Sequence, residues 1–448
     1  MEPSGKVKKG FRTAKLWGSL LGNKSKINRL QREISRLRAS PSLRLGSHIT
    51  NAMRKPWRAI FLPITLPSLM LKIGWEMLGK KSAPEIESRV TYDEDAPARN
   101  CVVMFPTNGV GFGHFTRTLA LAKRMKKLDP ELEIIFFTTM PTLHLLKEHG
   151  IPAHFISGPK YFKDMESAEW NALVEEELTL CFDTHRPKMF VFDGAFPYRG
   201  MLRAISPRED IDKLWMRRGT FRKGSNIPVD SIDFFDAIIH PEDSVRRSSN
   251  SLEHNVEVIT CPPILILDED EKLPRGEARR RLGIPIESTA VYVQLGAGEI
   301  NDINSEIHLT ISALTSNEGV HVILGESLIG SRISIDLENV HIIRDYPNAI
   351  YFNGFDATVQ AGGYNSFHET RQSNLPALFY PNMNTGMDDQ LARCKIAVEE
   401  GWGLVVEQRN QKSITEGVSQ LLDKTRIQDG DFERSGAWDL AEKLRERK

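Results

Sequence analysis

The sequence of 448 residues lacks several features that would place it in a class at once. It has four cysteines, Cys101, Cys181, Cys261 and Cys394, which lie far apart without paired spacing. We therefore expect buried thiols in a reducing compartment, and neither a disulfide framework nor a zinc site. No apolar run with a small-residue cleavage site follows the basic residues 1–15, which argues against a cleavable signal. There is no low-complexity tract, and the length indicates two or three domains.

Acidic residues are scarce at one end of the chain. Residues 1–81 hold 18 lysines and arginines against 3 acidic residues, a net charge of +15. The remainder holds 41 basic against 56 acidic residues, a net charge of −15, although the whole chain is neutral. This separation predicts an anionic partner for the N-terminal segment.

Residues 1–95 form a predicted basic, amphipathic extension. Residues 24–38 place isoleucines and leucines at helical spacing between arginines. The uncharged run 59–71 is interrupted by two prolines and is too short to cross a bilayer, which needs roughly 20 apolar residues. Flanking basic residues and tryptophans favour a position in the membrane interface. Packing on a domain or partner chain is an alternative, whereas nucleic acid would need a base-reading motif that the extension lacks.

We therefore expect residues 1–81 to bind an anionic membrane surface. The protein would be cytoplasmic and peripherally associated with the inner face of the cell membrane.

An α/β domain is predicted over residues 96–264. Apolar segments predicted as strands alternate with a helix-like segment; the strands are 101–105, 134–138 and 189–192, and the helix is 116–127. This alternation is typical of a doubly wound parallel sheet with helices on both faces. Ligands bind such sheets at the carboxyl ends of the strands, where the glycine-rich loop 109–114 and Asp193 fall.

Several residues at these strand ends are candidates for acceptor chemistry. Gly111 and Gly113 would let the backbone approach a ligand, but the loop is not a dinucleotide fingerprint. His114 could deprotonate an acceptor hydroxyl, because its ordinary pKa lies near working pH. It could equally cap the helix or bond a carbonyl. Asp193, with Arg199 nearby, could orient the acceptor or the histidine, or could cap the next helix.

A second α/β domain is predicted over residues 265–425, followed by a helical tail over 426–448. The acidic residues 268–271 would be a solvated linker. The loop containing Gly296 and Gly298 can offer N–H groups to a diphosphate, assisted by a helix dipole. The predicted strands are 290–294, 321–324, 340–343, 356–360 and 375–381.

The strongest signal is a strand–turn–helix segment at 356–371. Glycines at the turn permit close approach, and the helix N-terminus offers donors to phosphate. One turn later, the carboxylate of Glu369 can accept hydrogen bonds from both ribose hydroxyls. Residues 388–390 open another predicted helix and would supply carboxylate and amide groups to bind the hydroxyls of a sugar. The predicted donor-binding residues are Gly296, Gly298, Gly362, Gly363, Asn365, Ser366, Glu369, Asp389 and Gln390.

The segments Gly362–Glu369, Pro376–Pro381, Asp389–Gln390 and Gly109–Arg117 together resemble the GT-B glycosyltransferases. The resemblance is nearest to the branch of the N-acetylglucosaminyltransferase that forms lipid II (glycosyltransferase family 28-like) and its predicted glycosyltransferase relatives. Gly111–Arg117 matches the Gly-x-Gly-His-x-x-Arg loop of those relatives. The resemblance implies two Rossmann-like domains facing a cleft, with the acceptor bound by the first and a UDP-sugar by the second.

By this resemblance, the reaction is an inverting, metal-independent transfer of a sugar to a hydroxyl of a glycan or lipid-linked acceptor. His114 or Asp193 would take the proton, with Arg117 and Arg199 near the acceptor, and no cofactor is expected besides the donor. Cell-surface polysaccharide or glycolipid synthesis at the membrane would be the setting. A UDP-sugar 2-epimerase of the same fold and a non-catalytic nucleotide-sugar-binding or anchoring subunit are the alternatives.

Overall fold

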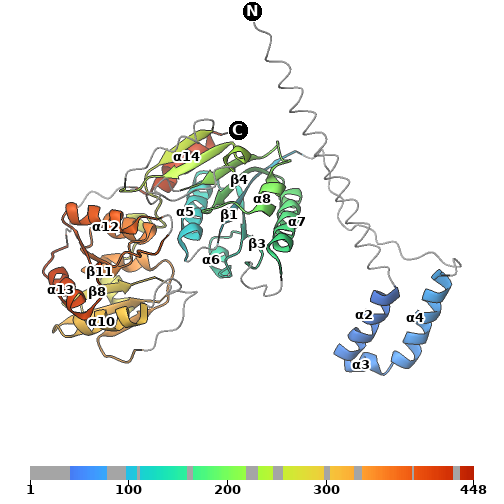
Figure 1. Cartoon of the computed structure of the whole chain (residues 1–448), viewed down its shortest axis with the longest axis horizontal. Coiled ribbons are helices and arrows are strands. Elements are labelled where there is room, and N and C mark those ends of the chain that lie inside the picture. Colours follow the sequence, from blue (N-terminus) through green and yellow to red (C-terminus); the bar gives the residue numbers. More distant parts are fainter. Residues whose placement is uncertain are drawn as a thin grey trace, which may run out of the picture. The chain divides into compact units, whose positions relative to one another are not determined.

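The computed structural model describes ten stretches of the chain (Figure 1). The chain divides into two compact units, Met1–Ala96 and Pro97–Lys448. The predicted helix 24–38 and Gly298 lie outside the described residues. The described stretches are 41–77, 97–107, 111–158, 165–217, 231–245, 256–296, 303–326, 335–385, 388–426 and 434–447.

The described part of the first unit is a helical hairpin. Helix α2 packs against α4, and the short α3 joins them. Arg44 and Glu76 form an ion pair between α2 and α4, and His48 Nε2 lies 2.9 Å from Thr65 Oγ1. Much of the apolar run 59–71 is therefore helical, with Pro67 inside α4. The three helices are α2 (Pro41–Arg54), α3 (Pro56–Ala59) and α4 (Leu62–Met77).

Most large apolar side chains of the hairpin face solvent. Among residues 41–77, the buried apolar side chains are Ala52 and Ile73. None of the helices that the structure describes is both long and apolar enough to span a bilayer. The exposed apolar side chains are Leu43, Ile49, Met53, Trp57, Ile60, Phe61, Ile64, Met70, Leu71 and Trp75.

A seven-stranded parallel sheet forms the first half of the second unit, in the order β3-β2-β1-β4-β5-β6-β7. Its strands read as continuous apolar runs because both faces are covered. The three predicted strands are confirmed within this sheet. The strands are β1 (Arg99–Pro106), β2 (Glu133–Thr138), β3 (Ala153–Phe155), β4 (Pro187–Asp193), β5 (Asp212–Met216), β6 (Ala237–Pro241) and β7 (Glu257–Cys261).

Helices cover both faces of this sheet, as expected. Strand β1 sends Val102 and Met104 into the core shared with α5, whereas Val103 and Phe105 enter the core shared with α7 and α8. This alternation follows from the two-residue period of a strand. The helices are α5 (Gly113–Leu128), α6 (His144–Lys147), α7 (Ser167–His185) and α8 (Arg199–Ile205).

A six-stranded parallel sheet forms the second half, in the order β10-β9-β8-β11-β12-β13. All five predicted strands are confirmed, with ends shifted by up to two residues. The strands are β8 (Thr289–Gln294), β9 (Val320–Gly325), β10 (Val340–Ile343), β11 (Ala357–Gln360), β12 (Ala377–Phe379) and β13 (Gly403–Val405). The helices are α9 (Arg275–Leu282), α10 (Ile303–Thr315), α11 (Tyr364–Gln372), α12 (Gln390–Glu399) and α13 (Gln411–Leu422).

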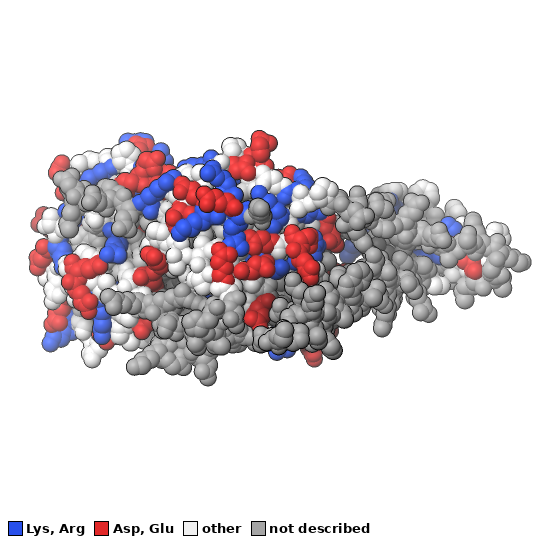
Figure 2. All heavy atoms as spheres, turned by 90° about the horizontal axis from the view of Figure 1, so that it is seen from above, with Lys and Arg blue, Asp and Glu red and all other residues white. Residues whose placement is uncertain are grey.

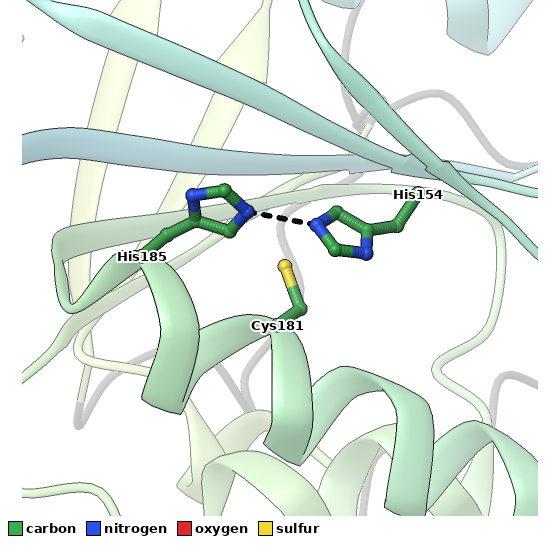
Figure 3. Close-up of side chains that lie close together, drawn as sticks. All are labelled: His154, Cys181 and His185. Atoms are coloured by element: carbon green, nitrogen blue, oxygen red, sulfur yellow. Dashed lines mark hydrogen bonds between the residues drawn. The ribbon is translucent and has the colours of Figure 1, made fainter. Parts of the chain in front are cut away.

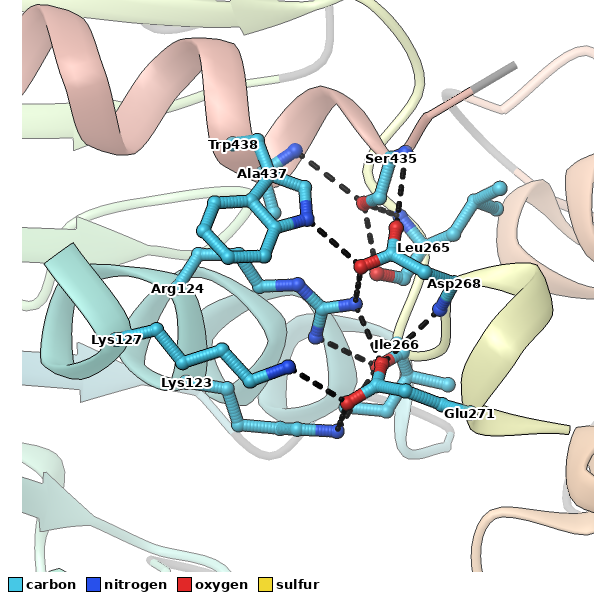
Figure 4. Close-up of polar contacts among 10 residues, drawn as sticks. All are labelled: Lys123, Arg124, Lys127, Leu265, Ile266, Asp268, Glu271, Ser435, Ala437 and Trp438. Atoms are coloured by element: carbon cyan, nitrogen blue, oxygen red, sulfur yellow. Dashed lines mark hydrogen bonds and ion pairs between the residues drawn. The ribbon is translucent and has the colours of Figure 1, made fainter.

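The prediction that residues 268–271 are a solvated linker is wrong. The fully buried guanidinium of Arg124 donates to Asp268 Oδ2 and Glu271 Oε2, each at 2.8 Å (Figure 4). Burial opposes ionisation of Glu271, but hydrogen bonding and Arg124 lower its pKa to about 2. A buried cation requires anionic partners, and Arg124 on α5 therefore holds the acidic segment 268–271 against this helix.

The last helix, α14 (Gly436–Arg445), returns to the first sheet and packs against α5 and β7. Trp438 Nε1 donates to Asp268 Oδ2 at 2.7 Å, and Ser435 Oγ donates to Leu265 O at 2.8 Å (Figure 4). A Cβ on Gly436 would lie 1.9 Å from Pro262 O, so glycine is needed for this approach. Basic and acidic side chains are interspersed on the face shown in Figure 2.

Candidate functional site

Each sheet has one place where its strand order reverses, and the predicted motifs fall at both. In the first sheet this switch point lies between β1 and β4. The glycine-rich loop follows β1, and Asp193 is the last residue of β4. In the second sheet it lies between β8 and β11, which lead to Gly296 and to Gly362. Chain segments diverge there to opposite faces of the sheet and leave room for a ligand.

His114 is held by a buried carboxylate. Its Nδ1 lies 2.6 Å from Asp193 Oδ1, and the same oxygen accepts from Arg117 Nη2 at 2.7 Å. Because a carboxylate only accepts, Nδ1 donates to Asp193, although Arg117 Nη2 also lies 3.0 Å from Nδ1; in this tautomer of the neutral imidazole, Nε2 keeps its lone pair. Helix α5 begins at Gly113 and so includes His114 in its first turn, three residues before the predicted start. The helix backbone, together with Asp193, therefore sets the orientation of the imidazole.

Asp193 is a permanent anion that positions the histidine. Its side chain is fully buried, and burial alone would raise its pKa. Arg117 and His114 outweigh burial and hold the pKa of Asp193 below its ordinary value. Asp193 does not cap the next helix, because Tyr198 occupies the N-cap of α8. The arginine beside Asp193 is Arg117, whereas Arg199 is exposed at the start of α8.

The two glycines of the second motif have different surroundings. A Cβ on Gly362 would lie 2.4 Å from Cys394 Sγ, so this glycine permits close packing of β11 against α12. A Cβ on Gly363 would meet no atom of the described residues within 4 Å, which leaves the N-terminus of α11 open to a ligand on their side. Ser366 lies in the first turn of α11 and is partly buried. The prediction of close ligand approach therefore fits Gly363, not Gly362.

Glu369 lies one turn along α11 with an unusual environment. Burial raises the pKa of its carboxyl group to about 7, and the opposing effect of Lys272 is smaller. No hydrogen bond to this carboxyl group occurs among the residues that the structure describes. An ionisable acceptor without a protein partner at a switch point is suited to accept hydroxyl groups of a ligand.

The remaining predicted donor residues are divided between backbone and side-chain roles. Gly296 has φ +101°, a conformation that strongly favours glycine, and no atom of the described part of the chain lies within 4 Å of its Cβ position. Asp389 caps α12 by accepting from Ala392 N at 3.0 Å. Gln390 Oε1 accepts from Asn382 N at 2.9 Å, which leaves its amide nitrogen as the group available to a sugar.

The carboxyl ends of the two sheets contact one another. Asn365 Nδ2 lies 3.4 Å from Gly113 O, next to His114, and the buried Asn365 Oδ1 has no partner among the described residues. Thr116 Oγ1 lies 2.9 Å from Tyr346 OH. The structure thus brings the start of α5 and the start of α11 together, as two domains sharing one site require.

Sequence reasoning missed a buried ion network at this junction. Arg393, fully buried on α12, donates to Asp243 Oδ2 and to Asp388 Oδ1, each at 2.6 Å. Burial would raise the pKa of Asp243, but His368 and Arg393 hold it far below its ordinary value. Asp243 follows β6 at the same sheet edge as Asp193, and this position was the available signal.

No protein-family model matches the chain. A glycosyltransferase of Methanopyrus kandleri described as uncharacterised is 25% identical over 188 residues, 40% of this chain. The chain matches about half of that relative's length, 52%.

Solved structures match the fold more widely. The glycotransferase of kitacinnamycin matches with a TM-score of 0.55 at 13% identity, covering 78% of this chain and 99% of that one. The spinosyn forosaminyltransferase SpnP matches with a TM-score of 0.53 at 13% identity, covering 78% and 94%. The chain has the GT-B fold. The predicted architecture is therefore confirmed.

Within this GT-B fold, His114, Arg117 and Asp193 lie on the first domain and Asn365, with Glu369 one turn later, on the second. The narrower resemblance to the lipid-II-forming branch stays a prediction. The identities of the donor and the acceptor also stay predictions.

Proposed function

We propose that the chain is a glycosyltransferase that moves a sugar from a UDP-sugar to a hydroxyl acceptor. One observation carries this proposal: the start of α5, with its His114–Asp193 pair, contacts the start of α11, with its unpartnered Glu369 one turn further on. A histidine suited to act as a base and a helix N-terminus suited to bind a nucleotide lie on the two sides of one junction. The names of the relatives with this fold support the same class of reaction.

The donor would bind at the second switch point. Glu369 accepts the two ribose hydroxyls, and the N–H groups at the start of α11, with Ser366, donate to the diphosphate. Gly296 lets the backbone approach the same phosphates. Asp389 binds the hydroxyls of the sugar through the carboxylate oxygen that does not cap α12, and Gln390 binds them through its amide nitrogen. UDP is favoured over other nucleotides by the sequence resemblance.

The acceptor would bind at the first switch point. Its hydroxyl oxygen attacks the anomeric carbon as the bond from that carbon to the diphosphate breaks, which inverts the configuration. His114 Nε2 takes the hydroxyl proton, and Asp193 stabilises the resulting imidazolium. Helix and backbone donors stabilise the charge on the leaving diphosphate, so protein dipoles replace a metal ion in this role.

The helical hairpin 41–77 would place the enzyme at a membrane, where a glycan or lipid-linked acceptor is accessible. Trp57, Ile60, Phe61 and Ile64 are exposed apolar side chains at and beside the turn between α2 and α4. Arg54, Lys55, Arg58 and Lys72 flank them on the same segment. Apolar groups that enter the interface beside lysines and arginines suit an anionic leaflet.

Binding of a panel of nucleotide sugars to the full-length protein tests the donor. UDP-sugars should bind, and His114→Ala should retain this binding while losing transfer. Binding of GDP- or CMP-sugars alone would overturn the UDP assignment, and no binding would overturn the transferase. Turnover of the UDP-sugar without an acceptor would indicate the epimerase.

Vesicle flotation tests the membrane role. The double variant Ile60→Glu with Ile64→Glu should float less than the wild-type protein on vesicles containing anionic lipid. Ile286→Glu, an exposed isoleucine of the larger unit, is the matched control. Equal flotation of all three proteins would refute the role of the hairpin.

A further inference from the structure

Three potential metal ligands meet away from the transferase site. His154 lies on β3, the edge strand of the first sheet, and Cys181 and His185 lie four residues apart on α7. Their ligand atoms all lie within 4.8 Å of one another (Figure 3). The four-residue spacing places Cys181 and His185 on the same face of the helix.

The side chains converge on one point. The Nε2 atoms of His154 and His185 lie 2.8 Å apart in a hydrogen bond, with the rings nearly perpendicular at 82°. Figure 3 shows the Cys181 sulfur directed toward the gap between the two imidazoles. Cys181 is fully buried, whereas both histidines are partly exposed, so solvent reaches the cluster from one side.

We propose that His154, Cys181 and His185 bind Zn²⁺. Imidazole nitrogen and thiolate sulfur are both zinc ligands, and three protein ligands leave the fourth tetrahedral position to a solvent molecule. Bond lengths of about 2.0 to 2.3 Å hold the ligand atoms of such an ion about 3.3 to 3.7 Å apart. The present separations therefore need adjustments of about 1 Å.

Binding has a defined proton balance. The thiol of Cys181 loses its proton to solvent as the Zn–S bond forms, because a coordinating thiol is deprotonated outright. The hydrogen bond between the two histidines breaks, and the proton that it held moves to Nδ1 of the same ring through solvent. Both imidazoles then offer an Nε2 lone pair while remaining neutral. One proton is released for each ion bound.

The position of the cluster gives the ion a structural role. His185 is the last residue of α7 and lies just before the amino end of β4, whereas Asp193 is the last residue of β4, at its carboxyl end. Seven strand residues at roughly 3.3 Å each separate these ends by about 20 Å. The ion would therefore join an edge strand to the helix that covers it, without entering the transfer reaction. The expectation that none of the cysteines binds zinc would be wrong for Cys181.

A second histidine pair provides a matched control. His321 and His341 lie on β9 and β10, neighbouring strands at an edge of the second sheet, with Nδ1 and Nε2 3.1 Å apart. No cysteine joins them in a metal-ligand group among the residues that the structure describes. The two pairs differ by the thiol, so the thiol should decide which pair binds the ion.

The test uses untagged, full-length protein from which metal has been removed by a chelator. Zn²⁺ should bind with one ion per chain and raise the unfolding midpoint. Co²⁺, used as a spectroscopic substitute, should give a thiolate-to-metal charge-transfer band that Cys181→Ser abolishes. His154→Gln and His185→Gln should each weaken Zn²⁺ binding by at least about tenfold. His321→Gln should leave binding unchanged.

Three results would overturn the site: no Zn²⁺ bound above background, a charge-transfer band that persists in Cys181→Ser, or equal losses in His185→Gln and His321→Gln. Because a serine hydroxyl at a buried position disfavours folding, circular dichroism of each metal-free variant is compared with wild type. The partly exposed histidine variants then decide the matter independently.

Discussion

Replacing Glu369 with glutamine should remove a pH dependence from both folding stability and donor binding. In the folded protein, burial raises the pKa of this carboxyl group to about 7 from an ordinary value of 4.5. The folded state thus holds the proton over a range in which the unfolded chain has released it. Stability from this group is complete below pH 4.5, falls as pH rises toward 7, and is constant above.

The size of the effect follows from the shift. A difference of 2.5 pKa units corresponds to about 3 kcal/mol of unfolding free energy between pH 4.5 and pH 8, since one unit is worth about 1.4 kcal/mol. Glu369→Gln should abolish this decline, because an amide does not titrate. Urea unfolding at several pH values measures it, with the exposed Glu399→Gln as the control.

Donor binding should show the opposite slope. Only the ionised carboxylate accepts both ribose hydroxyls, and about a tenth of Glu369 is ionised at pH 6 against about nine tenths at pH 8. Affinity for a UDP-sugar should therefore rise about tenfold over this range in wild type and stay flat in Glu369→Gln. A UDP-sugar is the suitable ligand in calorimetry, because its esterified diphosphate does not titrate here, unlike the terminal phosphate of UDP.

A flat wild-type binding profile, combined with a stability profile that shows the raised pKa, would refute the assignment of Glu369 to the ribose. The same slope in Glu369→Gln as in wild type would do so too, because the titrating group would then lie elsewhere. An unchanged stability profile alone would refute only the raised pKa.

Further variants separate packing from ligand contact. Gly362→Ala should lower the unfolding free energy by about 1–3 kcal/mol through overpacking, whereas Gly363→Ala should leave urea unfolding unchanged yet weaken UDP-sugar binding in calorimetry. Asp193→Ala should destabilise by about 3–5 kcal/mol in the same unfolding assay, since it leaves a buried arginine unpaired; His114→Ala, which removes only the partly exposed imidazole, should cost much less. Asp243→Ala removes one of the two carboxylates that bind Arg393 and leaves Asp388, so it should destabilise less than Asp193→Ala; a loss under about 1 kcal/mol would contradict the ion network.

Much of the fold could be predicted because buried parallel strands are continuous apolar runs between glycines and polar residues. The segments that became β1, β4 and β8 stand out in this way. The start of α5 was placed three residues late, because Gly113 is a poor helix former and resembles loop. Its backbone is nonetheless helical, since the following turn packs into the core.

The interactions that sequence reasoning missed join residues far apart in the chain. Arg393 and Asp243 are separated by 150 positions, and Arg124 and Asp268 by 144. An acidic run such as 268–271 resembles a solvated linker until its partner is known. Sequence proximity likewise does not determine which arginine reaches a buried carboxylate, because Asp193 binds Arg117, 76 positions away, whereas the nearby Arg199 is exposed.

Two of the predicted site carboxylates, Asp193 and Glu369, illustrate how the environment divides their roles. Burial disfavours ionisation of both Asp193 and Glu369, yet their pKa values move in opposite directions. Asp193 contacts Arg117 and His114 directly, so it remains an anion throughout the working range and can only hold the histidine. Glu369 has the weaker influence of Lys272 and no hydrogen bond in the described structure, so its charge depends on pH and on the ligand. The pH dependence of donor binding should therefore arise from Glu369 and not from Asp193.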